Sequence, residues 1–221
     1  MSLEELNKEV ISCRKCPRLV AWREKVAKEK RRAYQNWDYW GKPVPGFGDP
    51  HAHIFVVGLA PGAHGSNRTG RQFTGDASGN FLYPALYRAG FANQPESNYL
   101  DDGLVLTHLY TAPVCRCVPP QNRPTPDEMS NCQSYLEREL ALIQPKVIVA
   151  LGRIAFDNVL KIYSARIYGW KFAHAAHYHL PSGVWLLCSY HPSQQNTLTG
   201  RLTVDMFDQI WELARNLVKV T

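Results

Sequence analysis

The stretch IFVVGLAPGAHGSNRTGRQFTGDASG, residues 54–79, decides the fold. It opens on four apolar residues, passes through six glycines and gives way to an apolar helical pattern that resumes at Phe81. This order predicts a buried strand, a long glycine loop and a helix. Loops longer than about 12 residues inside a compact domain are usually functional or disordered, and the aromatic and charged residues of this loop favour a function. An unstructured surface loop is the alternative.

The rest of the chain alternates between strand and helix patterns. Further strands are expected at 104–110, 146–151 and 185–190, and helices at 3–12, 17–32, 81–89, 126–143, 154–162 and 204–218. Segments 43–50, 111–124 and 163–181 are expected to be irregular. The alternation predicts an α/β layered fold with a mainly parallel sheet, in a single domain of residues 1–221. The glycine loop, the loop after Tyr110 and the loop from His191 then share the carboxyl edge of the sheet, where ligands bind.

Composition limits the classes of function. The chain of 221 residues carries a formal charge of +6, and it has no apolar run near the ~20 residues of a membrane span. Its N-terminus lacks the basic start and hydrophobic middle of a secretory signal, so we expect a cytoplasmic protein. A basic segment that runs into aromatic residues favours a nucleic-acid partner, with a solvated helix face and a packed aromatic loop as the alternative. The segment contains Arg23, Lys25, Lys28, Lys30, Arg31, Arg32, Tyr34, Trp37, Tyr39 and Trp40.

Six cysteines in an intracellular chain suggest metal ligands more than disulfides. Four form a coherent set, in which a CxxC turn is joined by one cysteine from a proline-rich loop and one near a helix start: Cys13, Cys16, Cys117 and Cys132. Cys115 competes with Cys117 for the third place, whereas Cys188 lies in an apolar strand and is expected to be a packed thiol. Four thiolates fit either zinc or a four-iron cluster, and a chain without metal is the alternative.

Three separated motifs resemble one family. They are GLAPGAHGSNRTGRQFTGDASG at 58–79, CRCVPPQNRPTP at 115–126 with Cys132 beyond it, and SYHPSQQNTLTGRLT at 189–203. Together they resemble the uracil-DNA glycosylase superfamily, and within it the iron-sulfur type B, or family five, enzymes. The resemblance implies a three-layer α/β/α fold with a central four-stranded, mainly parallel sheet. It also implies a 4Fe-4S cluster on the four cysteines of the set, which favours iron over zinc. We expect the protein to be a monomer.

The same resemblance implies an activity in DNA repair: extrahelical binding of uracil, or of another deaminated base such as hypoxanthine, and hydrolysis of its glycosidic bond. Related families position the attacking water with a carboxylate or asparagine in the first motif, but this chain has Ala63, His64 and Gly65 there. Asp76 matches the aspartate favoured as a substitute in type B enzymes, and a helix N-cap is its alternative role. His191 is expected to donate to the oxygen of the leaving base, where negative charge develops, rather than to be a merely packed histidine.

The pocket for the base draws on two of the motifs. Phe73 is expected to stack on the base, and the backbone at Gly58, Ala60 and Gly62 to approach it closely because glycine leaves space. Asn122 has an amide that can pair with a carbonyl and an imide together, although a local turn is an equally simple use of this residue.

The loop after His191 is expected to enter the minor groove. Asn196 and Arg201 would contact the strand or its phosphates, with Leu198 as a wedge. Phosphates around the flipped nucleotide are assigned to His64, Asn67 and Arg68. A nucleotide hydrolase is a weaker interpretation because the GK[ST] of a P-loop is missing. A metal-stabilised nucleic-acid-binding module without glycosylase activity is the other alternative.

Overall fold

The computed structural model describes residues 1–220, and within them six strands form one sheet in the order β1-β3-β2-β4-β6-β5. The strands are β1 (Phe47–Gly48), β2 (Ile54–Gly58), β3 (Leu109–Pro113), β4 (Val147–Leu151), β5 (His177–His179) and β6 (Trp185–Ser189). The four central strands run parallel, and β1 and β5 pair antiparallel at the two edges.

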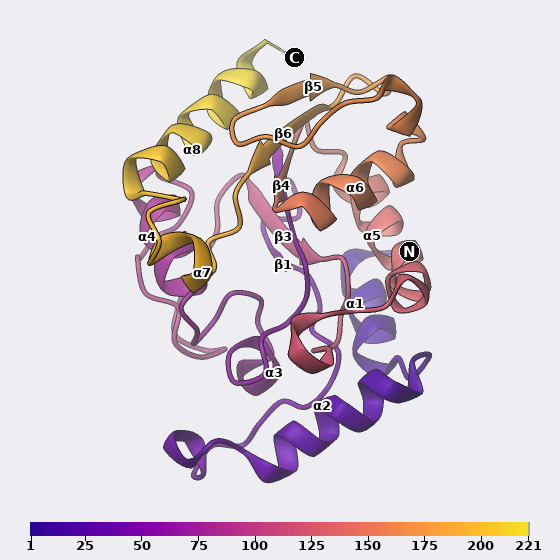
Figure 1. Ribbon diagram of the computed structural model, residues 1–221, viewed down its shortest axis with the longest axis vertical. Coiled ribbons are helices and arrows are strands. Elements are labelled where there is room, and N and C mark those ends of the chain that lie inside the picture. The colour runs from indigo at the N-terminus through magenta and orange to yellow at the C-terminus, as the bar shows by residue number, and fades with distance from the viewer. Residues whose placement is uncertain (221) are drawn as a thin grey trace.

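Helices cover both faces of this sheet. α4 (Gly79–Arg88) and α8 (Val204–Lys219) lie on one face, and α5 (Pro126–Ile143) and α6 (Arg153–Ile162) lie on the other (Figure 1). α1 (Leu3–Ser12) packs on α5, and α2 (Pro17–Glu29) runs below the carboxyl edge (Figure 1). Shorter elements are α3 (Ser66–Thr69), α7 (Gln194–Thr197) and the 3-10 turns η1 (Arg32–Tyr34), η2 (Pro120–Asn122) and η3 (Ala165–Tyr168). The result is the expected three-layer α/β/α arrangement.

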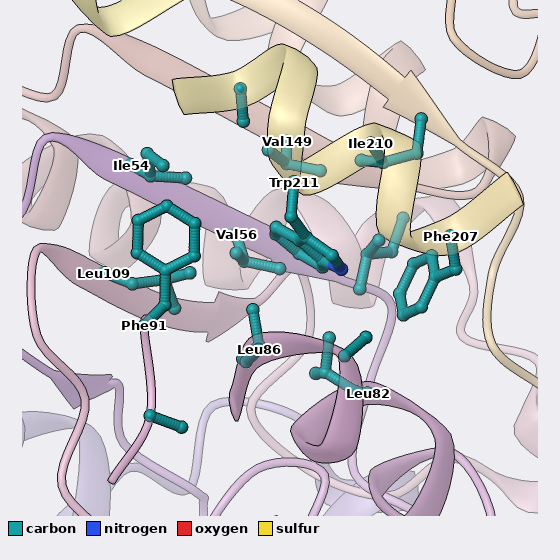
Figure 2. Close-up of a cluster of buried hydrophobic side chains, with 14 of the residues drawn as sticks. Ile54, Val56, Leu82, Leu86, Phe91, Leu109, Val149, Phe207, Ile210 and Trp211 are labelled. Atoms are coloured by element: carbon teal, nitrogen blue, oxygen red, sulfur yellow. The ribbon is translucent and has the colours of Figure 1, made fainter. Parts of the chain in front are cut away.

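Two hydrophobic layers follow from the alternation of side chains along each strand. In β2, Ile54 and Val56 face α4 and α8, whereas Phe55 and Val57 face α5 and α6. Figure 2 shows the first layer, where Trp211 and its neighbours on α8 point toward the side chains of β2 and α4. Because both faces are buried, the parallel strands are continuous apolar runs in the sequence, which is why their positions were predictable.

The central four-stranded parallel sheet is confirmed, but the whole sheet is wider. The edge strands β1 and β5 lie in segments that were expected to be irregular, 43–50 and 163–181. They contain two and three residues and leave no periodic pattern.

The predicted position of β3 was wrong. The sequence pattern placed a strand at 104–110, whereas β3 spans Leu109–Pro113, and Leu106 forms an isolated bridge with Ala92 instead. The proline-rich composition of this region argued against a strand, but Pro113 is the last residue of β3, where the lost N–H costs little.

The start of α5 agrees with the sequence. The hydroxyl of Thr125 accepts from the backbone N–H of Glu128 at 3.3 Å, and the Glu128 carboxylate accepts from the N–H of Thr125 at 2.8 Å. This capping box satisfies two amides at the helix start. α2 ends at Glu29, three residues before its expected end, because Lys30 adopts a positive φ of 53°.

Candidate active site

A cleft of about 630 Å³ opens at the carboxyl edge of the sheet. Its walls come from the segments that follow β2, β3 and β6, as the topology of a parallel sheet predicts. Six residues that the sequence singled out line it: Ala60, Gly62, Phe73, Asp76, Asn122 and His191. The cleft therefore brings together both expected catalytic residues and four of the five expected base-binding residues.

Phe73 is held by glycines on two sides. The side chain is 5% exposed and its φ is 55°, a left-handed conformation that is rare for an aromatic residue. A Cβ on Gly79 would overlap the Phe73 carbonyl, and a Cβ on Gly58 would lie 2.8 Å from the tip of the ring. Gly58 therefore leaves room for the Phe73 ring and does not itself line the cleft. Backbone strain of this kind persists only where the surrounding structure enforces it, as at many functional sites.

One carboxylate oxygen of Asp76 accepts a hydrogen bond, and the other lies beside two glycines. Oδ1 accepts from the backbone N–H of Gly79 at 3.0 Å, so the capping role considered from the sequence is present as well. Oδ2 lies so close to Gly65 that a Cβ there would overlap it, and a Cβ on Gly62 would lie 3.1 Å away. Burial raises the pKa of Asp76, and the backbone amides at the start of α4 and the charge of Arg68 oppose that rise. A carboxylate with little water around it is suited to act as a base.

His191 follows β6 and is stiffened by Pro192. Burial lowers the pKa of His191 to about 4, so the ring is neutral at pH 7. A neutral imidazole still donates one N–H. Its ring centroid lies 6.0 Å from that of Phe73, with 45° between the planes. The side chain of Asn196 donates to the His191 carbonyl at 2.9 Å, which fixes the course of the loop.

Asn122 lies at the exposed rim of the cleft. It and Gln121 both have positive φ, 56° and 55°, so the backbone of η2 is folded tightly to present them. Arg123, which the sequence did not single out, also lines the cleft, and its carbonyl accepts from Arg18 at 3.2 Å. Arg18 in turn forms an ion pair of 2.7 Å with Glu128. These contacts tie the rim of the cleft to α2.

Gln72 is a second lining residue that sequence reasoning missed. It is 2% exposed, and its Oε1 accepts from the Thr111 hydroxyl at 2.9 Å. In the sequence, its position directly before Phe73 was the feature that could have indicated a place in the cleft.

The three residues expected to hold phosphates do not line the cleft. Asn67 is fully buried and donates to the carbonyl of Arg23 at 3.3 Å, and Arg68 is 3% exposed. The expectation of phosphate contacts is corrected for these two, because neither side chain reaches the surface. His64 is half-buried, with Nδ1 3.1 Å from the Tyr39 hydroxyl.

The loop after His191 is more accessible. Leu198 is 81% exposed, and Arg201 is exposed with its guanidinium 4.7 Å from the ring centroid of Tyr190. Both lie next to the cleft wall formed by α7. Their placement is compatible with the expected contacts to DNA.

Five cysteines gather between the N-terminal helices and α5. The thiol of Cys115 hydrogen bonds to that of Cys132, which raises the pKa of Cys115 and lowers that of Cys132. Cys16 accepts from the Asn131 side chain at 3.4 Å. Cys13 interacts electrostatically with Cys16 and Cys117, so the thiols of all five lie near one another.

This donor set fits a group that binds thiolates, since soft sulfur ligands from a CxxC turn and two further segments converge. In residues 1–220, however, no three His, Cys, Asp or Glu side chains are grouped at metal-ligand spacing. Cys117 also accepts from the buried guanidinium of Arg23 at 3.0 Å. Cys188 is fully buried in the core of β6, as expected for a packed thiol.

Comparison with known sequences identifies the fold family. A sequence model of the uracil DNA glycosylase superfamily matches residues 45–215. The chain belongs to the uracil DNA glycosylase superfamily. It is 53% identical over 218 residues to the Type-5 uracil-DNA glycosylase of Thermus thermophilus, covering 98% of this chain and 99% of the relative.

Two mycobacterial relatives place the chain in the same branch of the superfamily. The Type-5 uracil-DNA glycosylase of Mycobacterium leprae is 49% identical over 223 residues, covering 99% of this chain and 97% of the relative. That of Mycobacterium bovis is 48% identical over 225 residues, covering 99% and 83%. The expected family-five resemblance is confirmed. Among residues 1–220, no helix has both the length and the apolar character that crossing a membrane requires.

Proposed function

We propose that this protein is a DNA repair glycosylase that hydrolyses the N-glycosidic bond of uracil, and of other deaminated bases such as hypoxanthine, to leave an abasic site. One observation carries the proposal. Phe73, Asp76 and His191, from two loops far apart in the sequence, converge in one cleft at the carboxyl edge of the sheet. The family and the Type-5 relatives support the same activity.

The cleft suits an extruded base. Flipping costs a few kcal/mol of stacking and pairing, which contacts in the pocket must return. The Phe73 ring supplies an aromatic face, and the backbone at Ala60 and Gly62 lines the same space without bulky side chains. Asn122 at the rim offers an amide that donates and accepts, which matches the carbonyl and imide edge of uracil.

Bond cleavage places charge where the cleft has groups to stabilise it. The electron pair of the glycosidic bond leaves with the base, so negative charge develops on the base carbonyl oxygens and positive charge on the sugar. Neutral His191 donates a hydrogen bond to the carbonyl oxygen, and an oxyanion donor of this kind is worth about 3 to 4 kcal/mol. The Asp76 carboxylate stabilises the sugar cation and accepts the proton of the water that attacks C1′. The base anion takes up a proton after its release, and Asp76 gives up the proton that it accepted from the water, so that protons are conserved over the reaction.

DNA around the flipped nucleotide would contact the loop after β6. Leu198 is exposed on this loop and would fill the gap left in the duplex. Arg201, exposed in the same loop, would contact the phosphates. Asn196 acts indirectly, through its hydrogen bond to the His191 carbonyl.

A four-iron cluster is the cofactor that fits the cysteines. Cys13, Cys16, Cys117 and Cys132 would hold it, with Cys115 as the competing third ligand. Such a cluster would act structurally, by joining the N-terminal helices to the segment that carries the rim of the cleft. Arg18 of α2 also holds that rim, through its contacts with Arg123 and Glu128.

The test is single-turnover cleavage of a uracil-containing duplex, followed by alkali to break abasic sites. Wild-type protein should produce scission at uracil, and a panel with hypoxanthine, xanthine and thymine mismatches defines the lesion class. Asp76→Asn should slow the cleavage step while binding of abasic DNA persists, and Asp101→Asn, at an exposed position away from the cleft, is the matched control. A wild-type protein that never cleaves would overturn the function. Unchanged cleavage by Asp76→Asn would remove Asp76 from the mechanism.

A further inference from the structure

Arg68 is a buried cation in contact with two aromatic rings, whose planes are 82° apart. Its guanidinium carbon lies 4.0 Å from the ring centroid of Tyr34 and 4.0 Å from that of Trp37. The residue is 3% exposed, so both contacts are made away from water. Cation-aromatic contacts are stronger when they are shielded from water. The segment 34–37 therefore clamps the side chain in one orientation.

The clamped guanidinium spans the glycine loop. Nε donates to the carbonyl of His64 at 2.7 Å, and Nη2 donates to the carbonyl of Gly75 at 3.0 Å. Gly75 directly precedes Asp76 and has a φ of 70°, so its peptide sets the direction in which the Asp76 side chain leaves the backbone. Arg68 thus fixes the peptide before Asp76 against the opposite arm of the loop.

The charge of Arg68 has no bonded carboxylate. Among the described residues Arg68 forms no ion pair, and its Nη1 is buried without a hydrogen-bond partner. Arg71, three positions further along, is equally buried but pairs with Asp102 at 2.7 Å. The positive field of Arg68 reaches Asp76, where it favours the ionised carboxylate. A buried guanidinium without a carboxylate partner keeps a net positive charge inside the loop.

We propose that Arg68 is a positioning residue for Asp76, holding the aspartate in place and ionised, and that Tyr34 and Trp37 keep Arg68 in its working orientation. This inference rests on the proposed role of Asp76 in glycosidic cleavage. Arg68 does not line the cleft. It acts through the Gly75 carbonyl and through its charge.

The test combines rate and pH dependence. Arg68→Gln should lower the single-turnover rate of uracil excision about 10- to 100-fold, because a carboxylate displaced by about 1 Å loses that much. Its affinity for abasic DNA should change little. The low-pH limb of the rate profile, which Asp76 controls because its carboxyl must be ionised to act, should move to higher pH, since loss of the positive charge raises the pKa of the carboxyl. Tyr83 of α4 interacts electrostatically with Asp76 and His191 lines the same cleft, and neither is altered in this variant.

A milder variant tests the same inference if Arg68→Gln fails to fold. Trp37 is half-buried, so Trp37→Leu leaves the core intact and retains the charge while removing one side of the clamp. It should lower the rate with a smaller shift in the pH profile. Arg71→Gln is the matched control in the same loop, and it should reduce thermal stability without moving the pH profile.

An activity-independent readout separates this inference from the proposed function. The carboxyl resonance of Asp76, followed by NMR in free protein with labelled aspartate, should titrate at higher pH in Arg68→Gln than in wild type. An unchanged titration together with an unchanged rate would overturn the inference, even if the protein cleaves uracil. A shifted titration in a protein that cleaves nothing would support the positioning and reject the glycosylase.

Discussion

Gly65→Ala should slow cleavage by displacing Asp76. A Cβ at this position would overlap Oδ2 of Asp76 and lie 2.7 Å from both its Cβ and its Cγ, whereas ordinary contact begins at 3.4 Å. The carboxyl group must therefore retreat by at least about 0.7 Å, and a misplacement of about 1 Å can cost about 10²-fold in rate. We expect single-turnover cleavage of uracil DNA to fall by about 30- to 100-fold, which corresponds to roughly 2 to 3 kcal/mol in the activation barrier.

Gly62→Ala is the graded comparison. A Cβ there would lie 3.1 Å from Oδ2 but 4.0 Å from Cγ, so the carboxyl group can remain close to its place. The loss in the chemical step should be clearly smaller than for Gly65→Ala. Thermal unfolding and binding of abasic DNA are measured in parallel, to show that both variants fold and bind. A folded Gly65→Ala protein that cleaves at the wild-type rate would refute the placement of Asp76 in the mechanism.

Three further predictions concern the rest of the molecule. The His191 imidazole should titrate near pH 4 by NMR, and the free energy of unfolding should fall as the pH drops from about 6.5 toward that value, since only the unfolded chain binds the proton there. His191→Asn should lose this part of the pH dependence, and a midpoint at 6.5 or above would contradict the burial of the ring. Cys117→Ser should abolish iron binding and absorbance at about 400 nm, whereas Cys115→Ser should retain both; the reverse pattern would exchange the ligands. Arg116 and Glu139 form a fully buried ion pair, so Glu139→Ala should cost about 3 to 5 kcal/mol in urea unfolding, and a cost below 1 kcal/mol would mean that the pair is solvated.

Much of the fold could be predicted from the sequence because local sequence patterns agreed with the tertiary structure. β4 and β6 are continuous apolar runs that are buried on both faces, and the capping box at Thr125 marks the start of α5 within one residue. β1 and β5 were missed because pairing with a neighbouring strand creates them, and no periodic pattern in two or three residues records that pairing.

The cleft was predictable for a related reason. The carboxyl ends of parallel strands share one edge, so residues after β2 and β6 had to meet there. The fates of the polar residues within the glycine loop were not predictable. Arginines such as Arg68 serve either a phosphate or an internal carbonyl, and the choice depends on whether a distant segment covers them. Tyr34 and Trp37 do so here, across more than thirty residues of sequence.

The aromatic rings that contact Arg68 come from a segment that precedes the superfamily match. The match to the superfamily begins at residue 45, yet the two rings that hold the loop's buried cation come from residues 34 and 37. The geometry of the loop is thus set partly by residues that precede the span matched by the superfamily model. Exchanging residues 1–44 between relatives would then retune the excision rate without altering one residue of the cleft, and this segment is where variation among such enzymes can be sought.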